Sequence, residues 1–127
     1  MITFRKLVMP ADLNPANRLF GGQMLKWCDE AAALYAMETL SKHLLVTAKV
    51  SEINFKVPIC NGDFIEFEAS TKAIGTKSFT VALSVWIKDI HNASNRAEAL
   101  TCEFVFVTID KNGNSVPHNY RVPSGAV

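Results

Sequence analysis

The stretch that decides the fold is GQMLKWCDEAAALYAMETLSK, which spans residues 22–42. It is rich in alanine, leucine and methionine and has no internal glycine or proline, so it predicts one α-helix from about Gly22 to Lys42. Apolar side chains cover roughly half of its helical wheel, so one face must be buried. That face carries Met24, Leu25, Cys28, Ala31, Ala32, Tyr35, Ala36 and Leu40. Its alanines would let a concave sheet approach the helix axis closely.

Strand patterns lie on both sides of this helix. Residues 2–8 are strand-like, whereas residues 9–20 hold two prolines and two asparagines and read as a loop. Four more strands are expected after the helix, at residues 45–58, 65–70, 79–87 and 97–109. The last of these has apolar residues on both faces, so we expect it to lie inside the sheet.

Local signals between these strands define the expected architecture. The apolar parity of residues 45–58 switches near Ser51-Glu52, which predicts a β-bulge. Asn61-Gly62-Asp63 is a hairpin turn signal, Ile74-Gly75-Thr76 predicts the next turn, and residues 91–95 read as a polar loop. Short connections imply antiparallel pairing. We therefore expect one α+β domain over residues 1–127, with about five antiparallel strands wrapped around the helix and an irregular tail at 111–127.

Composition argues against several classes of protein. The 127 residues fit a single domain, and 49% apolar against 20% charged residues is a globular balance. A formal charge of +1 argues against a non-specific nucleic-acid binder. No window approaches the roughly 20 apolar residues of a membrane span, so no membrane partner is expected. The three cysteines form no disulfide or C-x-x-C pattern, which favours the cytoplasm, and the three histidines show no metal-ligand spacing.

Asp29 is the residue that does not fit the apolar face of the helix. A carboxylate buried without a partner is costly, so either the apolar stripe is narrower and Asp29 lies at its rim beside Lys26, or the acid has a function. Directly before the helix stands the pair Gly21-Gly22. The N–H groups of a first helical turn have no intrahelical acceptor and favour negative charge, which suits a developing oxyanion.

Two segments around these residues resemble a known family. The run MPADLNPANRLFGGQMLKWCDEAAA, residues 9–33, is similar to the opening of hotdog-fold acyl-CoA thioesterases of the brain acyl-CoA hydrolase type. VTAKVSEINFKVPICNGD, residues 46–63, is similar to the next block of that family, and the resemblance continues through GTKS at residues 75–78. It fades after Ile109, so the tail receives no functional assignment from it.

The resemblance implies a thioesterase that hydrolyses acyl-CoA to a free acid and CoA without metal or cofactor. Asp29 matches the general base or nucleophile, and Asn14 matches an asparagine contributed by the neighbouring subunit. Gly21 and Gly22 match the loop that polarises the thioester carbonyl, and Thr47 falls near the catalytic pocket. Water activation and direct attack by the carboxylate both remain open.

The resemblance also bears on substrate binding and assembly. Gly75, Lys77 and Ser78 lie in the turn that contacts the CoA nucleotide in the family. The family forms homodimers, often assembled into hexamers as trimers of dimers. Two other activities remain open, a non-catalytic acyl-CoA sensor and a hotdog enoyl-thioester hydratase or dehydratase. The latter chemistry generally pairs a histidine with the helix acid, and no histidine precedes Asp29 in this chain.

Overall fold

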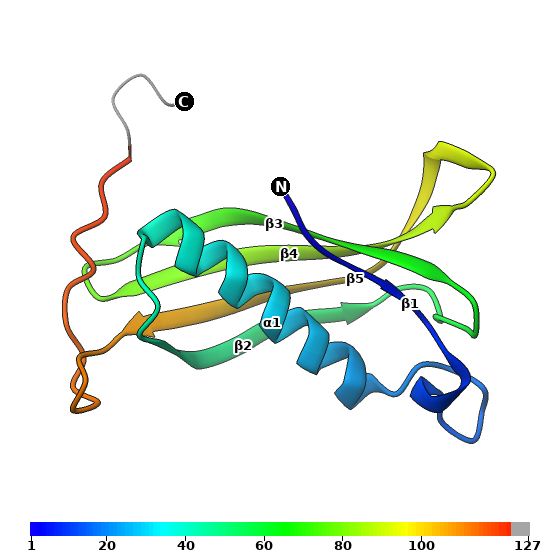
Figure 1. The fold of residues 1–127 in the computed structure, drawn as a ribbon, viewed down its shortest axis with the longest axis horizontal. Coiled ribbons are helices and arrows are strands. Elements are labelled where there is room, and N and C mark those ends of the chain that lie inside the picture. The colour runs from blue at the N-terminus through cyan, green and yellow to red at the C-terminus, as the bar shows by residue number, and fades with distance from the viewer. Residues whose placement is uncertain (123–127) are drawn as a thin grey trace.

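The computed structural model describes residues 1–122, except for the side chain of Ala93, so residues 123–127 of the expected tail lie outside the described part. Within residues 1–122 the chain forms one α-helix, one short 3-10 helix and five strands. In chain order these are β1 (Ile2–Leu7), η1 (Pro10–Asp12), α1 (Gly21–Leu40), β2 (Leu45–Phe55), β3 (Phe64–Ile74), β4 (Ser78–Asp89) and β5 (Asn92–Thr108). Figure 1 shows α1 lying across one face of a curved sheet, as the sequence predicted.

The strands form one antiparallel sheet in the order β1-β3-β4-β5-β2. Gly75 sits in the β3–β4 hairpin as predicted, but the hairpin expected at Asn61-Gly62-Asp63 is wrong. β2 pairs with β5 and not with β3, and the turn at Gly62 instead bonds back to the end of β1 through Val8. A turn signal specifies a local reversal of the chain, and long-range packing decides which strands pair.

The expected loop at residues 91–95 is also wrong, because β5 already begins at Asn92. Asn92 is paired with Asp89, so the turn is confined to Ile90 and His91. This hairpin projects beyond the rest of the sheet (Figure 1), and Ile90 at its tip is 82% exposed. A strand exposed on both faces has no apolar alternation to reveal it in the sequence.

The buried face of α1 explains how the helix lies so close to the sheet. Ala31, Ala32 and Ala36 are fully buried, and small side chains permit this close approach. The other buried residues of the helix are Met24, Trp27, Cys28 and Leu40. Trp27 was not expected on this face. Its indole lies under the ammonium of Lys6, 5.0 Å from the ring centroid, so β1 covers it.

β2 forms an edge of the described sheet and is the most exposed of its strands. The predicted bulge is confirmed, because the β2–β5 register shifts between Ser51 and Asn54 and Glu52 has a φ of 55°. A second shift separates Thr47 from Lys49. The large apolar side chains that β2 leaves exposed are Val46, Val50, Ile53 and Phe55. An apolar edge of this kind is a ready site for pairing with another chain.

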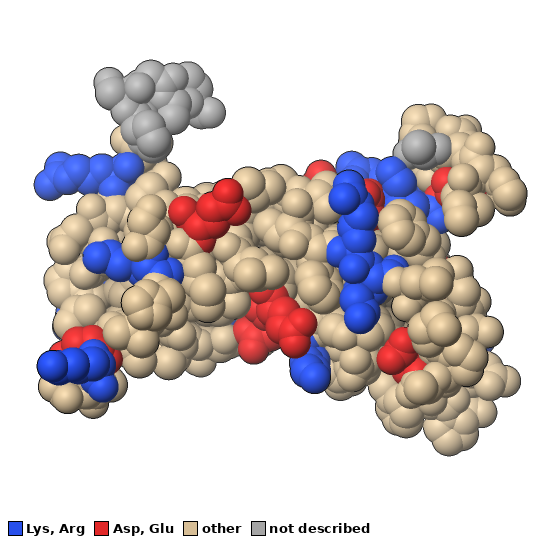
Figure 2. Space-filling view, viewed as in Figure 1, with Lys and Arg blue, Asp and Glu red and all other residues tan. Residues whose placement is uncertain are grey.

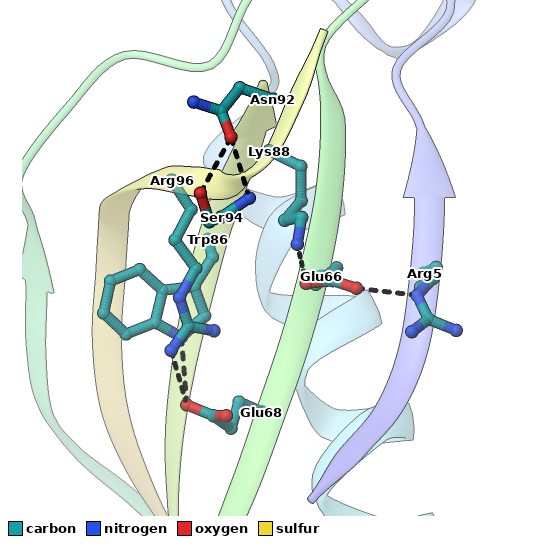
Figure 3. A network of polar contacts seen from close by, with 8 residues as sticks. All are labelled: Arg5, Glu66, Glu68, Trp86, Lys88, Asn92, Ser94 and Arg96. Carbon is teal, nitrogen blue, oxygen red and sulfur yellow. Dashed lines mark hydrogen bonds and ion pairs between the residues drawn. The ribbon is translucent and has the colours of Figure 1, made fainter. Parts of the chain in front are cut away.

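An ion-pair network covers part of the sheet near the β4–β5 hairpin (Figure 3). Glu66 accepts a hydrogen bond of 2.7 Å from Arg5 Nε and lies 3.4 Å from Lys88 Nζ. Burial by itself would raise the pKa of Glu66, but the hydrogen bond from Arg5 and the charge of Lys88 outweigh it and hold the pKa below its usual value. Beside it, Glu68 accepts from the indole of Trp86.

This network gives a pH-dependent contribution to stability. The pKa of Glu66 is lower in the folded chain than in the unfolded one, so the stabilisation is present above the ordinary value of 4.5 and is lost as pH falls through the folded value. We expect Glu66→Gln to lower the free energy of unfolding by about 1–2 kcal/mol at pH 7, a figure reduced because Arg5 is solvent-exposed. Urea unfolding at pH 7 and pH 3 checks this.

The matched control is Glu38→Gln, which neutralises an exposed acid on α1 and should leave stability unchanged. The difference between wild type and Glu66→Gln should shrink towards zero at pH 3. A difference of equal size at both pH values would contradict the ionic origin of the effect.

Candidate active site

The structure brings Asp29 and Thr47 together. Asp29 lies in the third turn of α1, and Thr47 lies near the start of β2. The hydroxyl of Thr47 donates a hydrogen bond of 2.7 Å to Asp29 Oδ1. Asp29 is half-buried, so it lies at the rim of the packed helix face and points to the edge strand. One carboxylate oxygen is thus held in place by a side chain from another element.

The first N–H groups of α1 have no acceptor within the helix. Met24 N–H donates to Phe20 C=O at 3.0 Å and closes the first turn, so the preceding N–H groups have no acceptor within the helix. A Cβ at Gly22 would meet nothing within 4 Å, and one at Gly21 would only touch the ring of Phe55 at 3.8 Å. Neither glycine has a positive φ, so neither is needed for an unusual backbone conformation. Their lack of a side chain instead leaves the backbone N–H groups accessible.

An apolar pocket of about 360 Å³ opens beside this helix start. Its lining includes Leu19, Met24, Phe55, Val57, Ile59 and Leu100. Phe55 is also the residue nearest to a Cβ built on Gly21, so the pocket adjoins the first turn of α1. Arg18 and Lys56 also line it. Lys56 is ion-paired with Glu98, so Arg18 is the lining residue that adds positive charge beside an otherwise apolar cavity. The pocket suits an apolar group whose polar end lies near the helix N-terminus.

Asn14 does not contact Asp29 through any hydrogen bond of the described chain. Its side-chain oxygen accepts the N–H groups of Ala16 at 2.9 Å and Arg18 at 3.2 Å, which shapes the loop before α1. Asn14 is half-buried, and its own N–H donates to Arg18 C=O. The structure therefore places this candidate on the loop that leads into the helix start.

The turn that carries Gly75, Lys77 and Ser78 lies at the opposite end of the sheet from the start of α1 (Figure 1). Gly75 N–H donates to Ser78 C=O at 2.9 Å, and Lys77 C=O accepts from Thr108 N–H at 3.0 Å. A Cβ at Gly75 would come within 2.3 Å of Ser78 Oγ, so the turn is tight. One chain alone thus does not join this turn to Asp29.

Two of the three cysteines are poorly placed for nucleophilic chemistry. Cys28 and Cys102 are buried. The hydrogen bond with Cys102 and, to a smaller extent, burial raise the pKa of the Cys28 thiol, which keeps it protonated. Residues 1–122 contain no group of three or more His, Cys, Asp and Glu side chains that could hold a metal ion. Among the described helices, none is long and apolar enough to cross a membrane.

Comparison with known proteins agrees with this geometry. The family model described as "Thioesterase superfamily" matches residues 16–94. The acyl-CoA thioester hydrolase YciA of Salmonella typhimurium is 30% identical over 118 residues, which cover 91% of this chain and 88% of that protein. The chain therefore belongs to the thioesterase superfamily.

Solved structures confirm the hotdog fold. The hexameric thioesterase y2039 from Yersinia pestis superposes with a TM-score of 0.85 at 30% identity, covering 98% of this chain and 97% of that one. The acyl-CoA hydrolase from Staphylococcus aureus, solved with butyryl coenzyme A, coenzyme A and coenzyme A disulfide, has a TM-score of 0.82 at 31% identity and covers 90% of this chain and 70% of that one. Variants of that enzyme were also solved in which one aspartate or one threonine is replaced by alanine.

The burial of the cysteines predicts their reactivity. We expect a colorimetric thiol reagent to modify Cys60 readily in the native protein, because Cys60 is partly exposed. Cys28 and Cys102 should stay unmodified, because both are buried. All three thiols should react after unfolding in urea. Cys60→Ser should abolish the fast native reaction, and a fast reaction that persists in this variant would contradict the buried packing of the other two.

Proposed function

We propose that this protein is an acyl-CoA thioesterase that hydrolyses an acyl-CoA thioester to a free carboxylic acid and CoA. The observation that carries the proposal is the hydrogen bond between Thr47 and Asp29 in a chain of the thioesterase superfamily. The residue types replaced in the Staphylococcus aureus variants, aspartate and threonine, are the two types that meet here.

Thr47 positions the carboxylate, and Asp29 is the base or the nucleophile. Thr47 holds Oδ1, which leaves Oδ2 for the reaction. In one route Oδ2 takes a proton from water, the resulting hydroxide adds to the thioester carbonyl, and collapse of the tetrahedral intermediate expels CoA thiolate. In the other, Oδ2 attacks the carbonyl and expels the thiolate, and water then hydrolyses the mixed anhydride. A thiolate is a good leaving group, so neither route requires a metal or cofactor.

The start of α1 supplies stabilisation for the oxyanion. The N–H groups of Gly21 and Gly22 lie in the unpaired first turn, and their missing side chains leave room for the thioester oxygen. With the carbonyl at this position, the adjoining apolar pocket is suited to the acyl group.

We propose that a second copy of the chain completes the site. Pairing of two β2 edges about a twofold axis would run the strands antiparallel and bury the exposed apolar residues of both. Because the start of α1 and the Gly75–Ser78 turn lie at opposite ends of the sheet, this operation carries the partner's turn to the end where α1 begins. Separately, from the resemblance of residues 9–33 to the hotdog acyl-CoA thioesterases, we propose that Asn14 acts in the partner's site.

We also propose a larger assembly, a partner molecule and a cellular location. The Yersinia pestis relative is hexameric, and we propose that this chain also forms a hexamer, built as a trimer of dimers. Acyl-CoA is the partner molecule, with Gly75, Lys77 and Ser78 at its nucleotide. The cytoplasm is the proposed location, because all three cysteines are free.

Thiol release from acetyl-, hexanoyl- and palmitoyl-CoA tests the function. We expect turnover by wild type and a fall in kcat of about a hundredfold or more in Asp29→Asn, because the amide is neither a base nor a nucleophile. Both proteins are assayed in a Cys60→Ser background to remove the protein's own fast thiol. No turnover on any substrate, with CoA still bound, would favour an acyl-CoA sensor, and equal turnover by both proteins would remove Asp29 from the chemistry.

Two variants of Thr47 separate the role of its hydroxyl from that of its shape. Thr47→Val keeps the shape but loses the hydroxyl, and we expect kcat to fall roughly ten- to a hundredfold, as for loss of a hydrogen bond to a charged group. Thr47→Ser keeps the donor and should retain most activity. Equal effects of the two variants on kcat would show that the hydroxyl does not position Asp29.

A further inference from the structure

The C-terminal tail, residues 109–122, folds back over the β3–β4 turn. It begins with a bridge between Ile109 and Ser115, and Val116 N–H then donates to Thr108 C=O at 2.9 Å. His118 N–H donates to Thr76 C=O at 3.2 Å. The tail is therefore hydrogen-bonded to the turn that the proposed function assigns to the CoA nucleotide.

His118 is the anchor of this segment. Its side chain is buried, with 4% exposure, and Nε2 lies 3.1 Å from the carbonyl oxygen of Ser78. Nδ1 accepts the N–H of Tyr120 at 3.0 Å, so Nδ1 carries no proton and Nε2–H donates to Ser78. Both ring nitrogens are used, one on the turn and one on the tail itself.

Tyr120 adds an apolar anchor two residues later. Its ring packs edge-on against Phe79 of β4, with centroids 6.1 Å apart, and Phe79 is fully buried. Asn119, between the two anchors, has a φ of 59°, a conformation that asparagine adopts more readily than most residues. The chain is thus fixed up to the residue before Arg121.

Arg121 lines a small cavity of about 230 Å³ between the tail and the turn. Gly75 and Thr76 line it from the turn, and residues 117–121 line it from the tail. These lining residues include no carboxylate, and Arg121 has no ion-pair partner among residues 1–122. Lys77, in the same turn, is tethered by a hydrogen bond from Nζ to Ser115 of the tail. Figure 2, which has the same viewpoint as Figure 1, shows Lys and Arg side chains at this end of the molecule.

We infer that the tail completes the nucleotide subsite, with Arg121 as a phosphate-binding cation and His118 as the positioning residue that holds it there. A cavity with a guanidinium and no competing acid selects for an anion, and phosphate groups are the anions of the CoA nucleotide. Because His118 and Tyr120 fix the backbone of the tail, little backbone entropy is lost on binding. This inference rests on the proposed function, since it takes the β3–β4 turn as the nucleotide-binding turn.

The test compares hexanoyl-CoA with hexanoyl-pantetheine, which has the same thioester without the nucleotide. For Arg121→Ala we expect kcat/KM on hexanoyl-CoA to fall roughly five- to tenfold, through KM, with no change on hexanoyl-pantetheine. His118→Gln should show the same selective rise in KM, whereas a merely destabilised fold would lower activity on both substrates. Lys111→Ala, which removes a cation of the tail outside the cavity, is the control and should match wild type.

Lys77→Ala separates failure of the inference from failure of the proposed site. If Lys77→Ala loses selectivity for the nucleotide and Arg121→Ala does not, the tail has no part in binding and the inference is wrong. If neither variant changes the ratio of the two substrates, the β3–β4 turn itself is not the nucleotide site. Equilibrium dialysis of CoA against wild type and Arg121→Ala gives the same comparison if turnover is absent, and equal affinities would overturn the inference.

Discussion

The packing of the alanine face of α1 against the sheet is the constraint on which the rest of the structure depends. Ala31, Ala32 and Ala36 are fully buried, and this lets the helix lie close to the sheet. The helix packs chiefly against β1, β3, β4 and β5. β2 is left at the edge, where Thr47 reaches across to Asp29. The position of the candidate site at an exposed edge is thus a consequence of how the helix is buried.

A single chain holds the parts of the proposed reaction at two separate ends. The unpaired first turn of α1 and the apolar pocket lie at one end of the sheet, and the turn and tail that would hold the nucleotide lie at the other. An extended thioester such as acyl-CoA has a reactive end and a nucleotide end that must be bound together. Twofold pairing at β2 unites the two ends from different chains and covers the exposed apolar strand at the same time.

Local features of this fold could be predicted from the sequence, and non-local ones could not. The helix, the bulge near Glu52 and the turn at Gly75 depend on residues close in sequence, and all three are confirmed. The pairing of β2 with β5 spans about half the chain, so the turn signal at Gly62 gave the wrong partner.

The site shows the same division. The helical wheel left two explanations open for Asp29, a place at the rim of the apolar face or a function. Only the fold shows that it faces Thr47 at the rim. The resemblance to a family supplied the pairing of these two residues in one site. Nothing in the sequence around His118 marked it, because the hydrogen bond that anchors the tail to the turn joins His118 to Ser78, 40 positions away.

The central claim is that each site draws on two chains, and complementation between inactive variants tests it most directly. Asp29→Asn and Asn14→Ala are each purified alone and also co-expressed in equal amounts with different tags. If Asn14 acts in the partner's site, each hybrid dimer regains one intact site. The mixed population should then recover about one quarter of wild-type turnover, while each variant alone stays inactive. A mixture as inactive as its parents would show that Asp29 and Asn14 act within one chain and would contradict the shared site.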